Sequence, residues 1–424
     1  MATAQQLTSL AVALRERGHD VTVVTSDRGY DNQAQRFPRR ETWQGIRIIR
    51  LPSLGLGKSS KWRRALNFVS FLVACTFHLL LLRKFDRVIA LTSPPLISFL
   101  GALFTRLKGG KFFFWVMDLN PDEAIAAGWL RPDSFTTKLL GSLLNFSLRH
   151  SERVIVLDRF MKQRIEAKGI SPDRIEIISP WSLDDSIQQD EQGREAFRVR
   201  HGFVEKFVVM YSGNHSPCHP LDTLMHAAES LSRRNDIVFC FVGGGSEQAK
   251  VRNFAADGQL ENIICLPYQP MNELSGSLSA ADLHVAVIGD PFVGIVHPCK
   301  VYNIIGIGTP LLYIGPEVSS IADLARQAAD RNAHYSIYQA RHGDVSAVAN
   351  AIERAQEEQS GNPVDLAFAH EFSAARLLTQ MLDLLEERIL KEDLDEIEGR
   401  VNRTVRIGSA LHSEPTALSR SEPR

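Results

Sequence analysis

The chain has 424 residues, of which 44% are hydrophobic and 23% charged, and its formal net charge is -1. This length is more than one hydrophobic core usually organises, so we expect two globular domains. A nearly neutral chain has no overall attraction for phosphate backbones, which excludes nucleic acid as a partner. The five cysteines are widely spaced and mostly apolar in context, which predicts free thiols in a reducing cytosol and no metal site. No apolar signal-peptide core follows Met1, so we expect a cytoplasmic protein.

The sequence opens on a pattern that predicts a helix. Leu7, Leu10, Ala11 and Leu14 form an apolar helix face, Gly18 is suited to end the helix, and the strand-like run VTVVT follows. A doubly wound domain usually begins with a strand and a glycine turn before such a helix. We therefore expect an N-terminal domain that lacks its first strand, through a misplaced start codon or a natural truncation.

Residues 58–84 combine an apolar run with basic flanks. The flanks carry a set of basic residues, namely Lys58, Lys61, Arg63, Arg64, Arg83 and Lys84. A membrane span needs about 20 apolar residues, so the run is borderline for a span. Asn67, Ser70, Ala74 and His78 share one helical stripe that suits contact with protein. We favour a helix on an anionic membrane surface, peripheral to the inner face of the plasma membrane, and a buried helix and a true span stay open.

Short apolar, β-branched runs then alternate with helical patterns along the chain, which is typical of parallel sheets. The first series lies at 21–25, 46–51, 87–92, 111–118, 153–158 and 174–179, and the second at 207–213, 237–245, 262–267, 282–289 and 310–315. Two series predict two doubly wound, Rossmann-like α/β domains. The predicted organisation is a first domain over 1–182, a second domain over 183–365, a helix over 366–392 that packs back toward the first domain, and a disordered tail over 393–424.

Polar residues follow a strand in WVMDLNPDEAIAAGW. Asp118 stands at the carboxyl end of the predicted strand, where α/β sheets place ligand sites. Asn120 and Asp122 come next, and we expect them to cap the following helix. Trp181, in ISPWS at the crossover between the domains, is expected either to stack or to fill a gap.

Glycines end two strands of the second series. Gly213, Gly243, Gly244 and Gly245 are placed where a missing side chain lets backbone N–H groups approach a diphosphate, although ordinary tight turns explain single glycines equally well. The segment HPCKVYN starts a predicted helix whose first turn faces the same crevice, with Pro298 near its start. His297 and Lys300 are therefore expected to face the ligand, and a surface lysine remains the alternative for Lys300.

These ordered motifs, from YSGN and FVGGG through SAADLHVAVI to GIVHPCKVYNIIGIGTPLLYIGP, resemble the nucleotide-sugar glycosyltransferases of family 4. The resemblance covers about residues 1–390, and the most similar members are bacterial exopolysaccharide enzymes of the colanic-acid type. It implies the GT-B architecture, in which two Rossmann-like domains face a cleft. It also implies a UDP- or GDP-sugar donor, a lipid-linked saccharide or polysaccharide precursor as acceptor, and transfer that mostly proceeds with retention. By this resemblance Asp118 orients the acceptor hydroxyl or its proton, and no cofactor or metal is expected.

The chain departs from the family pattern at its phosphate-binding positions. Most members carry an arginine and a lysine after the first strand of the second domain, where this chain has Asn214 and His219. Most also carry two glutamates in the HPCK region, which here fall near Phe292 and on Lys300. The resemblance thus implies that the cation has moved from one loop to the other. His215 and His219 are further candidate donors to phosphate, or else solvated loop histidines.

Two other classes of protein stay open. A nucleotide-sugar epimerase shares the two-domain architecture but needs no membrane acceptor, so the basic apolar segment counts against it. An inactive, truncated transferase acting as a binding or scaffold protein fits the missing strand and the lost glutamates. The glycine turns and HPCK count against a scaffold, which has no need of them.

Overall fold

The computed structural model describes residues 2–29, 35–56, 61–182, 187–331, 333–358 and 366–386. The predicted tail over 393–424 and Lys58 lie outside these residues. Residues 1–378 form one compact unit, and the elements below belong to it except for the end of the last helix, which lies in the second unit.

The first domain contains two sheets rather than one. Helix α1 (Ala2–Glu16) precedes a three-stranded sheet of order β1-β3-β2, built from β1 (Thr22–Ser26), β2 (Arg40–Trp43) and β3 (Ile46–Leu51). A four-stranded parallel sheet of order β4-β5-β6-β7 follows, with β4 (Arg87–Ala90), β5 (Lys111–Trp115), β6 (Arg153–Val156) and β7 (Ile175–Ile177). No strand precedes α1 within the described part of the chain, as the helix-first pattern predicts.

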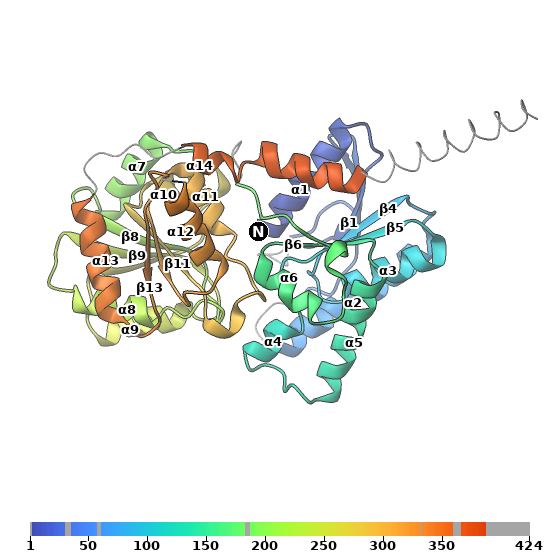
Figure 1. Ribbon diagram of the computed structural model, residues 1–424, viewed down its shortest axis with the longest axis horizontal. Helices are drawn as coiled ribbons and strands as arrows, with labels where there is room; N and C mark the ends of the chain where they lie inside the picture. Colours follow the sequence, from blue (N-terminus) through green and yellow to red (C-terminus); the bar gives the residue numbers. More distant parts are fainter. Residues whose placement is uncertain are drawn as a thin grey trace, which may run out of the picture. The chain divides into compact units, whose positions relative to one another are not determined.

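Helices connect and cover these strands (Figure 1). They are α2 (Lys61–Leu81), α3 (Ile97–Lys108), α4 (Asp122–Ala126), α5 (Phe135–His150) and α6 (Arg159–Glu166), and a short 3-10 helix, Pro172–Arg174, precedes β7. Two of them begin at side-chain caps that satisfy free backbone N–H groups: Ser134 accepts from Thr137, and Asp158 accepts from Met161.

The second domain is a doubly wound parallel sheet of six strands, in the order β10-β9-β8-β11-β12-β13. Its strands are β8 (Phe207–Asn214), β9 (Ile237–Gly244), β10 (Ile263–Leu266), β11 (Leu283–Val287), β12 (Leu311–Ile314) and β13 (Ile337–Ala340). The chain leaves β8 in one direction and returns on its other side as β11, so the topological switch point lies between β8 and β11. The predicted fold class, two Rossmann-like α/β domains, is confirmed.

Helices cover both faces of this sheet (Figure 1). Apolar residues of α8 (Asp222–Ser230) and α13 (Val345–Glu357) pack on one face, and residues of α7 (Glu191–His201) pack on the other. The remaining helices are α9 (Gln248–Asp257), α10 (Leu274–Ser279), α11 (Lys300–Ile307), α12 (Ser320–Asp330) and α14 (Leu366–His370), with a further helix over 374–386. Two short 3-10 helices, Met271–Glu273 and Asp290–Phe292, complete the domain.

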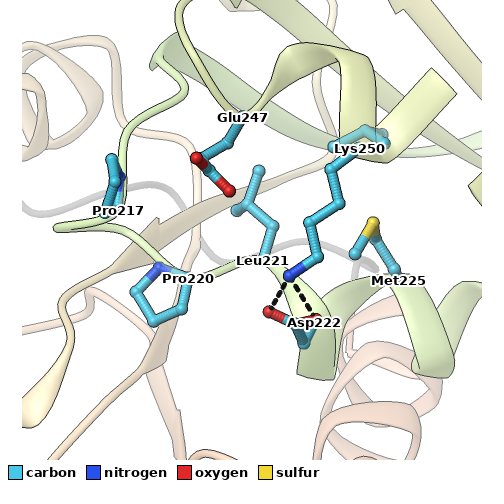
Figure 2. Close-up of a pocket in the computed structure, with 8 residues that line it drawn as sticks. Pro217, Pro220, Leu221, Asp222, Met225, Glu247 and Lys250 are labelled. Atoms are coloured by element: carbon cyan, nitrogen blue, oxygen red, sulfur yellow. Dashed lines mark hydrogen bonds and ion pairs between the residues drawn. The ribbon is translucent and has the colours of Figure 1, made fainter. Parts of the chain in front are cut away.

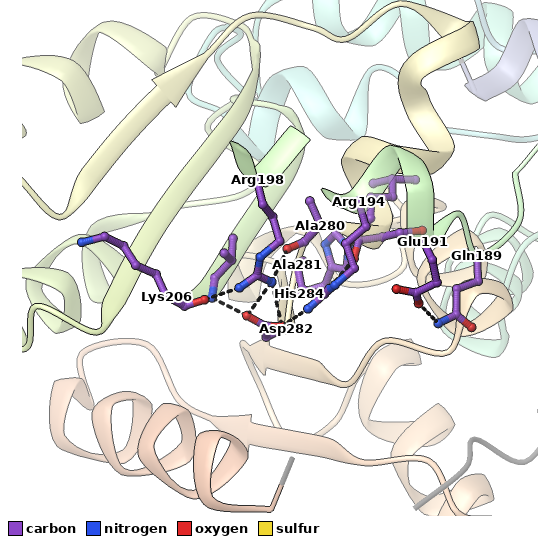
Figure 3. A network of polar contacts seen from close by, with 12 residues as sticks. Gln189, Glu191, Arg194, Arg198, Lys206, Ala280, Ala281, Asp282 and His284 are labelled. Carbon is purple, nitrogen blue, oxygen red and sulfur yellow. Dashed lines mark hydrogen bonds and ion pairs between the residues drawn. The ribbon is translucent and has the colours of Figure 1, made fainter. Parts of the chain in front are cut away.

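A buried charge network fastens α7 to the sheet (Figure 3). Asp282, just before β11, accepts hydrogen bonds from Arg194 and from Arg198, the latter at 3.0 Å to each carboxylate oxygen. It also accepts from the backbone N–H of Val208 in β8, at 2.8 Å. Every carboxylate lone pair is thereby used, which is the condition under which a buried charge is tolerated.

The helix α2 lies on the surface with one face buried. Asn67 and Ser70 accept hydrogen bonds from the backbone N–H groups of Leu56 and Leu54, and Phe71 and Cys75 join the core beneath the helix. The predicted protein-facing stripe is therefore correct. The opposite stripe stays exposed; we call it the apolar face of α2, namely Leu66, Val69, Val73, Phe77 and Leu80. No helix among the described residues is long and apolar enough to cross a membrane.

Candidate functional site

Lys300 is the first residue of α11, and its ammonium lies against an aromatic ring. The Nζ atom is 3.3 Å from the centroid of Tyr211 in β8, and it is buried without a hydrogen-bond partner among the described residues. Burial lowers the pKa of Lys300 well below its ordinary value, because a charge is costly away from water. A cation held by the face of a ring alone lacks the anion that usually accompanies a buried charge.

The surroundings of Lys300 place it at the switch point of the sheet. A side-chain carbon built on Gly213, at the end of β8, would lie 3.7 Å from Nζ. The first turn of α11 therefore sits beside the carboxyl end of β8, next to β11. Ligands of open α/β sheets bind in the crevice at this position.

The glycine turn after β9 packs tightly against the loop after β8. Gly243 and Gly245 have positive φ angles of 132° and 142°, and a side chain on either would collide with the backbone carbonyl of Gly213 or His215. Gly244 pairs with Asn214 at the end of the two strands, and its carbonyl accepts from the N–H of His215 at 2.8 Å. The turn alternative therefore accounts for Gly243 and Gly245, and their predicted contact with phosphate stays a prediction.

The loop after β8 carries two histidines that are neutral at neutral pH. Burial first, and then the charge of Lys300, lowers the pKa of His215 and that of His219 to about 4. His219 donates through Nδ1 to the carbonyl of Val287 at 2.6 Å, which leaves its other ring nitrogen for a ligand. Asn214 is exposed at the mouth of the same loop. These side chains offer hydrogen bonds but not the two charges that the family pattern supplies here.

A small cavity is lined in part by this loop (Figure 2). It has a volume of about 220 Å³ and is lined by Pro217, Pro220, Leu221, Asp222, Met225, Glu247, Lys250 and Val251. Lys250 and Asp222 form an exposed ion pair across it at 2.6 Å. Lys250 is therefore a lysine of the same domain with an anionic partner, in contrast to Lys300.

Asp118 follows β5 in the first domain, as predicted. Its backbone N–H donates to Thr92 Oγ1 at 3.2 Å. Burial, and secondarily the charge of Glu123, raises the pKa of Asp118 to about 7. The side chain can therefore bind or release a proton near neutral pH, which suits an acid or a base acting on a hydroxyl.

The prediction that Asn120 or Asp122 caps the next helix is wrong. Pro121 stands at the N-cap of α4, and no side chain caps it. Asn120 donates to Glu123 Oε2 at 3.1 Å, whereas Asp122 pairs with Lys168 at 2.8 Å. The rigid ring of Pro121 takes the first position because it needs no hydrogen-bond donor there.

Glu123 connects Asp118 with the loop after β8. Its Oε1 atom accepts from the thiol of Cys218 at 3.6 Å, and Cys218 lies between the two histidines of that loop. The acid that shifts the pKa of Asp118 is thus in contact with the phosphate-side loop. The sequence singled out neither Glu123 nor Tyr211; both lie in quoted motifs, but no local spacing marks their contacts.

His297 and Trp181 are placed in packed surroundings. The Nδ1 atom of His297 is 2.7 Å from Asp158 Oδ2, and its Nε2 atom is 2.8 Å from the hydroxyl of Tyr302. Both ring nitrogens are occupied, so a ligand would have to displace a partner. Trp181 is 1% exposed and stacks on Trp115 with 5.5 Å between ring centroids, so it fills the core.

Comparison with known proteins gives a family match for the first domain. A model described as glycosyl transferase 4-like domain matches residues 2–181. The first domain is a glycosyl transferase 4-like domain.

Curated relatives of the chain carry glycosyltransferase names. The chain is 25% identical over 244 residues to the glycosyltransferase named WbjE of Pseudomonas aeruginosa, a match that covers 57% of this chain and 61% of the relative. It is 25% identical over 309 residues to the colanic acid biosynthesis glycosyl transferase named WcaI of Escherichia coli, covering 70% of this chain and 75% of the relative. The chain thus spans less than two thirds of the first relative.

Solved structures show the same fold as this chain. The sucrose-phosphate synthase of Thermosynechococcus elongatus matches with a TM-score of 0.69 and 14% identity, covering 91% of this chain and 93% of that one. The Anabaena protein Alr3699/HepE in complex with UDP-glucose matches with a TM-score of 0.65 and 13% identity, covering 90% and 95%. These structures therefore show that the chain shares their two-domain α/β fold.

Proposed function

We propose that the protein transfers a sugar from a UDP- or GDP-sugar to a lipid-linked saccharide or polysaccharide precursor, with retention, in the synthesis of a bacterial surface or exopolysaccharide. The name of the WcaI relative, colanic acid biosynthesis glycosyl transferase, supports the pathway class. The HepE structure, of the same fold, is a complex with UDP-glucose, which supports a nucleotide-sugar donor. The proposal includes no metal ion, so turnover should be unchanged by EDTA.

The observation that carries the proposal is the unpartnered ammonium of Lys300. It lies at the switch point of the sheet, on the ring of Tyr211 and beside the backbone of Gly213. An ammonium at a helix N-terminus faces the positive end of the helix dipole, so an anion is needed to make the position favourable. The donor's diphosphate supplies that anion, and its charge grows as the glycosidic bond breaks. Asn214, His219 and the glycines of the two turns are proposed to complete the donor site.

Asp118 is proposed to act on the acceptor side. A carboxyl whose pKa is raised to about 7 is partly deprotonated at neutral pH and can accept a hydrogen bond or proton from the acceptor hydroxyl. The leaving phosphate is proposed to share this role, since retaining transfer brings both groups to the same face of the sugar. Asp118 would then orient the hydroxyl while Lys300 stabilises the leaving group.

The test of this function compares nucleotide release by Lys300 variants. The purified protein is incubated with UDP- and GDP-sugars, with and without a lipid extract that contains acceptor. Lys300→Ala should lower kcat/KM by about 2 to 4 kcal/mol, or roughly 30- to 1000-fold, and Lys300→Glu at least as much. Lys250→Ala is the matched control, because its ammonium is exposed and already paired with Asp222. Values for both Lys300 variants within about threefold of the parent would contradict the proposed contact.

The same assay separates the alternative functions. A transferase releases nucleotide in proportion to sugar incorporated into lipid. An epimerase would alter the sugar without any acceptor, and a scaffold would bind nucleotide or lipid without turnover. Either of these last two results would reject the proposed transfer.

We also propose that the apolar face of α2 docks on an anionic membrane surface, where a lipid-linked acceptor is found. The five side chains of this face are between 43% and 67% exposed, and a contiguous exposed apolar stripe on a helix commonly marks an interaction site. Residues 58–85 contain no acidic residue, and Arg63, Arg83 and Lys84 flank the helix on its exposed side. This charge pattern complements anionic headgroups, and the exposed apolar stripe suits insertion at a lipid surface.

Vesicle sedimentation tests the docking proposal. Val73→Ser combined with Phe77→Ser should weaken binding to phosphatidylglycerol vesicles, and glutamine at Arg63, Arg64, Arg83 and Lys84 should weaken it by about 1 kcal/mol per charge near the surface. High salt should act in the same direction as the glutamine variant. Val199→Ser with Val204→Ser is the control, since these valines are 63% and 62% exposed on the second domain. Binding that is indifferent to the α2 changes and to salt would reject the proposal.

A further inference from the structure

The loop over 293–299, which leads into α11, is seated on the first domain. The carbonyl of Ile295 accepts from the N–H of Leu119 at 2.8 Å, and the carbonyl of Val293 accepts from Arg164 Nε at 2.8 Å. Gly294 has a φ of 71°, and a side chain built there would lie 2.7 Å from the backbone of Phe160. The loop backbone therefore approaches the first domain as closely as a glycine permits.

His297 fixes the end of this loop through both of its ring nitrogens. Its side chain is 1% exposed and lies between Asp158, at the N-cap of α6, and Tyr302, in the first turn of α11. The rings of His297 and Tyr302 are parallel within 5°, with centroids 5.6 Å apart. The histidine thus bridges an element of the first domain and a helix of the second.

The protonation of Asp158 sets the direction of these hydrogen bonds. Burial alone would raise its pKa, but hydrogen bonds from His297 and from the N–H groups at the start of α6 leave it below the ordinary value. Asp158 is therefore a carboxylate that accepts from His297 Nδ1–H. The other nitrogen, Nε2, then accepts from the hydroxyl of Tyr302, which gives a chain of three groups with a single polarity.

We propose that Asp158, His297 and Tyr302 form a positioning relay that holds loop 293–299 on the first domain and keeps Asp118 and Lys300 in a fixed relation during transfer. Lys300, the first residue of α11, comes three residues after His297, and Leu119, whose N–H bonds to Ile295, directly follows Asp118. The relay thereby connects the acceptor-side carboxyl with the donor-side ammonium through one loop. The roles of these two groups rest on the proposed function, whereas the fixation of the loop does not.

Four variants separate positioning from ligand contact. His297→Phe keeps a ring for Tyr302 but leaves the Asp158 carboxylate without its partner. His297→Asn retains a donor at the position of Nδ1 and loses only the link to Tyr302. Tyr302→Phe removes one oxygen atom and preserves packing. Asp158→Asn keeps an oxygen for the cap of α6 and forces His297 to reverse its tautomer.

Three measurements are made on each variant: hydrogen exchange at the amide of Leu119 without substrate, the Kd for UDP, and kcat. His297→Phe should speed exchange at Leu119 at least tenfold and lower kcat about 100-fold, since small displacements of reacting groups have effects of this size, while the Kd changes less than threefold. His297→Asn and Asp158→Asn should show smaller changes than His297→Phe in both the exchange rate at Leu119 and kcat. If His297→Phe does not fold, Tyr302→Phe serves in its place, with a loss of about tenfold in kcat and faster exchange at Leu119.

Two results would overturn the relay. One is a kcat and a Leu119 exchange rate within threefold of the parent in the tested variant. The other is a rise in Kd equal to the fall in kcat, which would make His297 a donor-binding residue instead. Failure of the proposed function would give a different result. The parent itself would then neither bind nor turn over a nucleotide sugar, while hydrogen exchange at Leu119 would still report whether the loop is held in place.

Discussion

Replacing Lys300 by methionine should stabilise the ligand-free protein while it damages donor binding. In the structure the ammonium is buried without an anion, and its only described partner is the ring of Tyr211. Methionine fills a similar volume without a charge, so it removes the cost of desolvation. Replacing buried charges by apolar groups of similar size commonly stabilises a protein by about 1 to 4 kcal/mol.

The loss of the cation–π contact offsets part of this gain. Such a contact contributes about 0.5 to 2 kcal/mol when it is shielded from water. The net expectation is an increase of about 1 kcal/mol in the free energy of unfolding. For a domain of the size of the second one, this corresponds to a rise of about 2 to 4 °C in Tm.

The stability difference between Lys300→Met and the parent should depend on pH. Lys300 has a lowered pKa in the folded state and an ordinary lysine pKa in the unfolded state. Between these two values the unfolded state binds more protons, so the stability of the parent rises with pH. The advantage of Lys300→Met should therefore be largest at pH 6 and shrink as pH rises toward the ordinary lysine pKa.

Thermal unfolding of the parent, Lys300→Met and the control Lys250→Met, from pH 6 to 9 and with and without UDP, checks this prediction. Lys250 is exposed and paired, so its replacement should change stability by less than about 0.5 kcal/mol. A UDP concentration that saturates the parent should stabilise the parent by more than it stabilises Lys300→Met, which inverts their order. If Lys300→Met without ligand is less stable than the parent at every pH, the interpretation that the ammonium of Lys300 is buried at a cost in stability is refuted.

Three further outcomes are expected from the pKa shifts and the buried charges. The kcat of the parent should rise with pH, with a midpoint near pH 7, because Asp118 acts as a base only when deprotonated. Asp118→Asn should lower kcat at least about 100-fold and flatten this pH profile. Glu123→Gln should move the midpoint to lower pH, because the charge of Glu123 raises the pKa of Asp118. Asp282→Ala leaves Arg198 charged and buried, so urea unfolding should show a loss of about 3 to 5 kcal/mol. His284, whose pKa burial lowers to about 4, should make stability fall as pH drops from about 6.5 to 4, and His284→Gln should weaken that fall in acid denaturation curves.

The sequence predicted the strands that are buried on both faces and also less buried ones such as β1. Runs such as FVVMYSG and IVFCFVGGG became β8 and β9, because a covered parallel strand requires continuous apolar side chains. The strands β2 and β13 were missed. β2 reads RETW and is largely exposed, and it pairs only with β3, so neither its composition nor its periodicity distinguishes it from a loop.

The candidate site was predictable in its positions but not in its contacts. The rule that ligand sites follow parallel strands placed Asp118, Gly213 and Lys300 at strand or helix ends. The partner of His297 is Asp158, 139 residues away in the chain, and local patterns carry no information about such a distance. For the same reason the sequence could not show that Tyr211 lies beneath Lys300.

The most direct test of the account measures how much the diphosphate contributes to binding. This contribution is the ratio of the Kd for a nucleoside to the Kd for its diphosphate. The two pairs to compare are uridine with UDP and guanosine with GDP. Calorimetry on the parent should give a large ratio for one of the two bases. Lys300→Met should lower that ratio about 30-fold or more, equivalent to about 2 kcal/mol, and leave the affinity for the nucleoside unchanged. An undiminished ratio in Lys300→Met would contradict the claim that this buried lysine binds the leaving group of a nucleotide sugar.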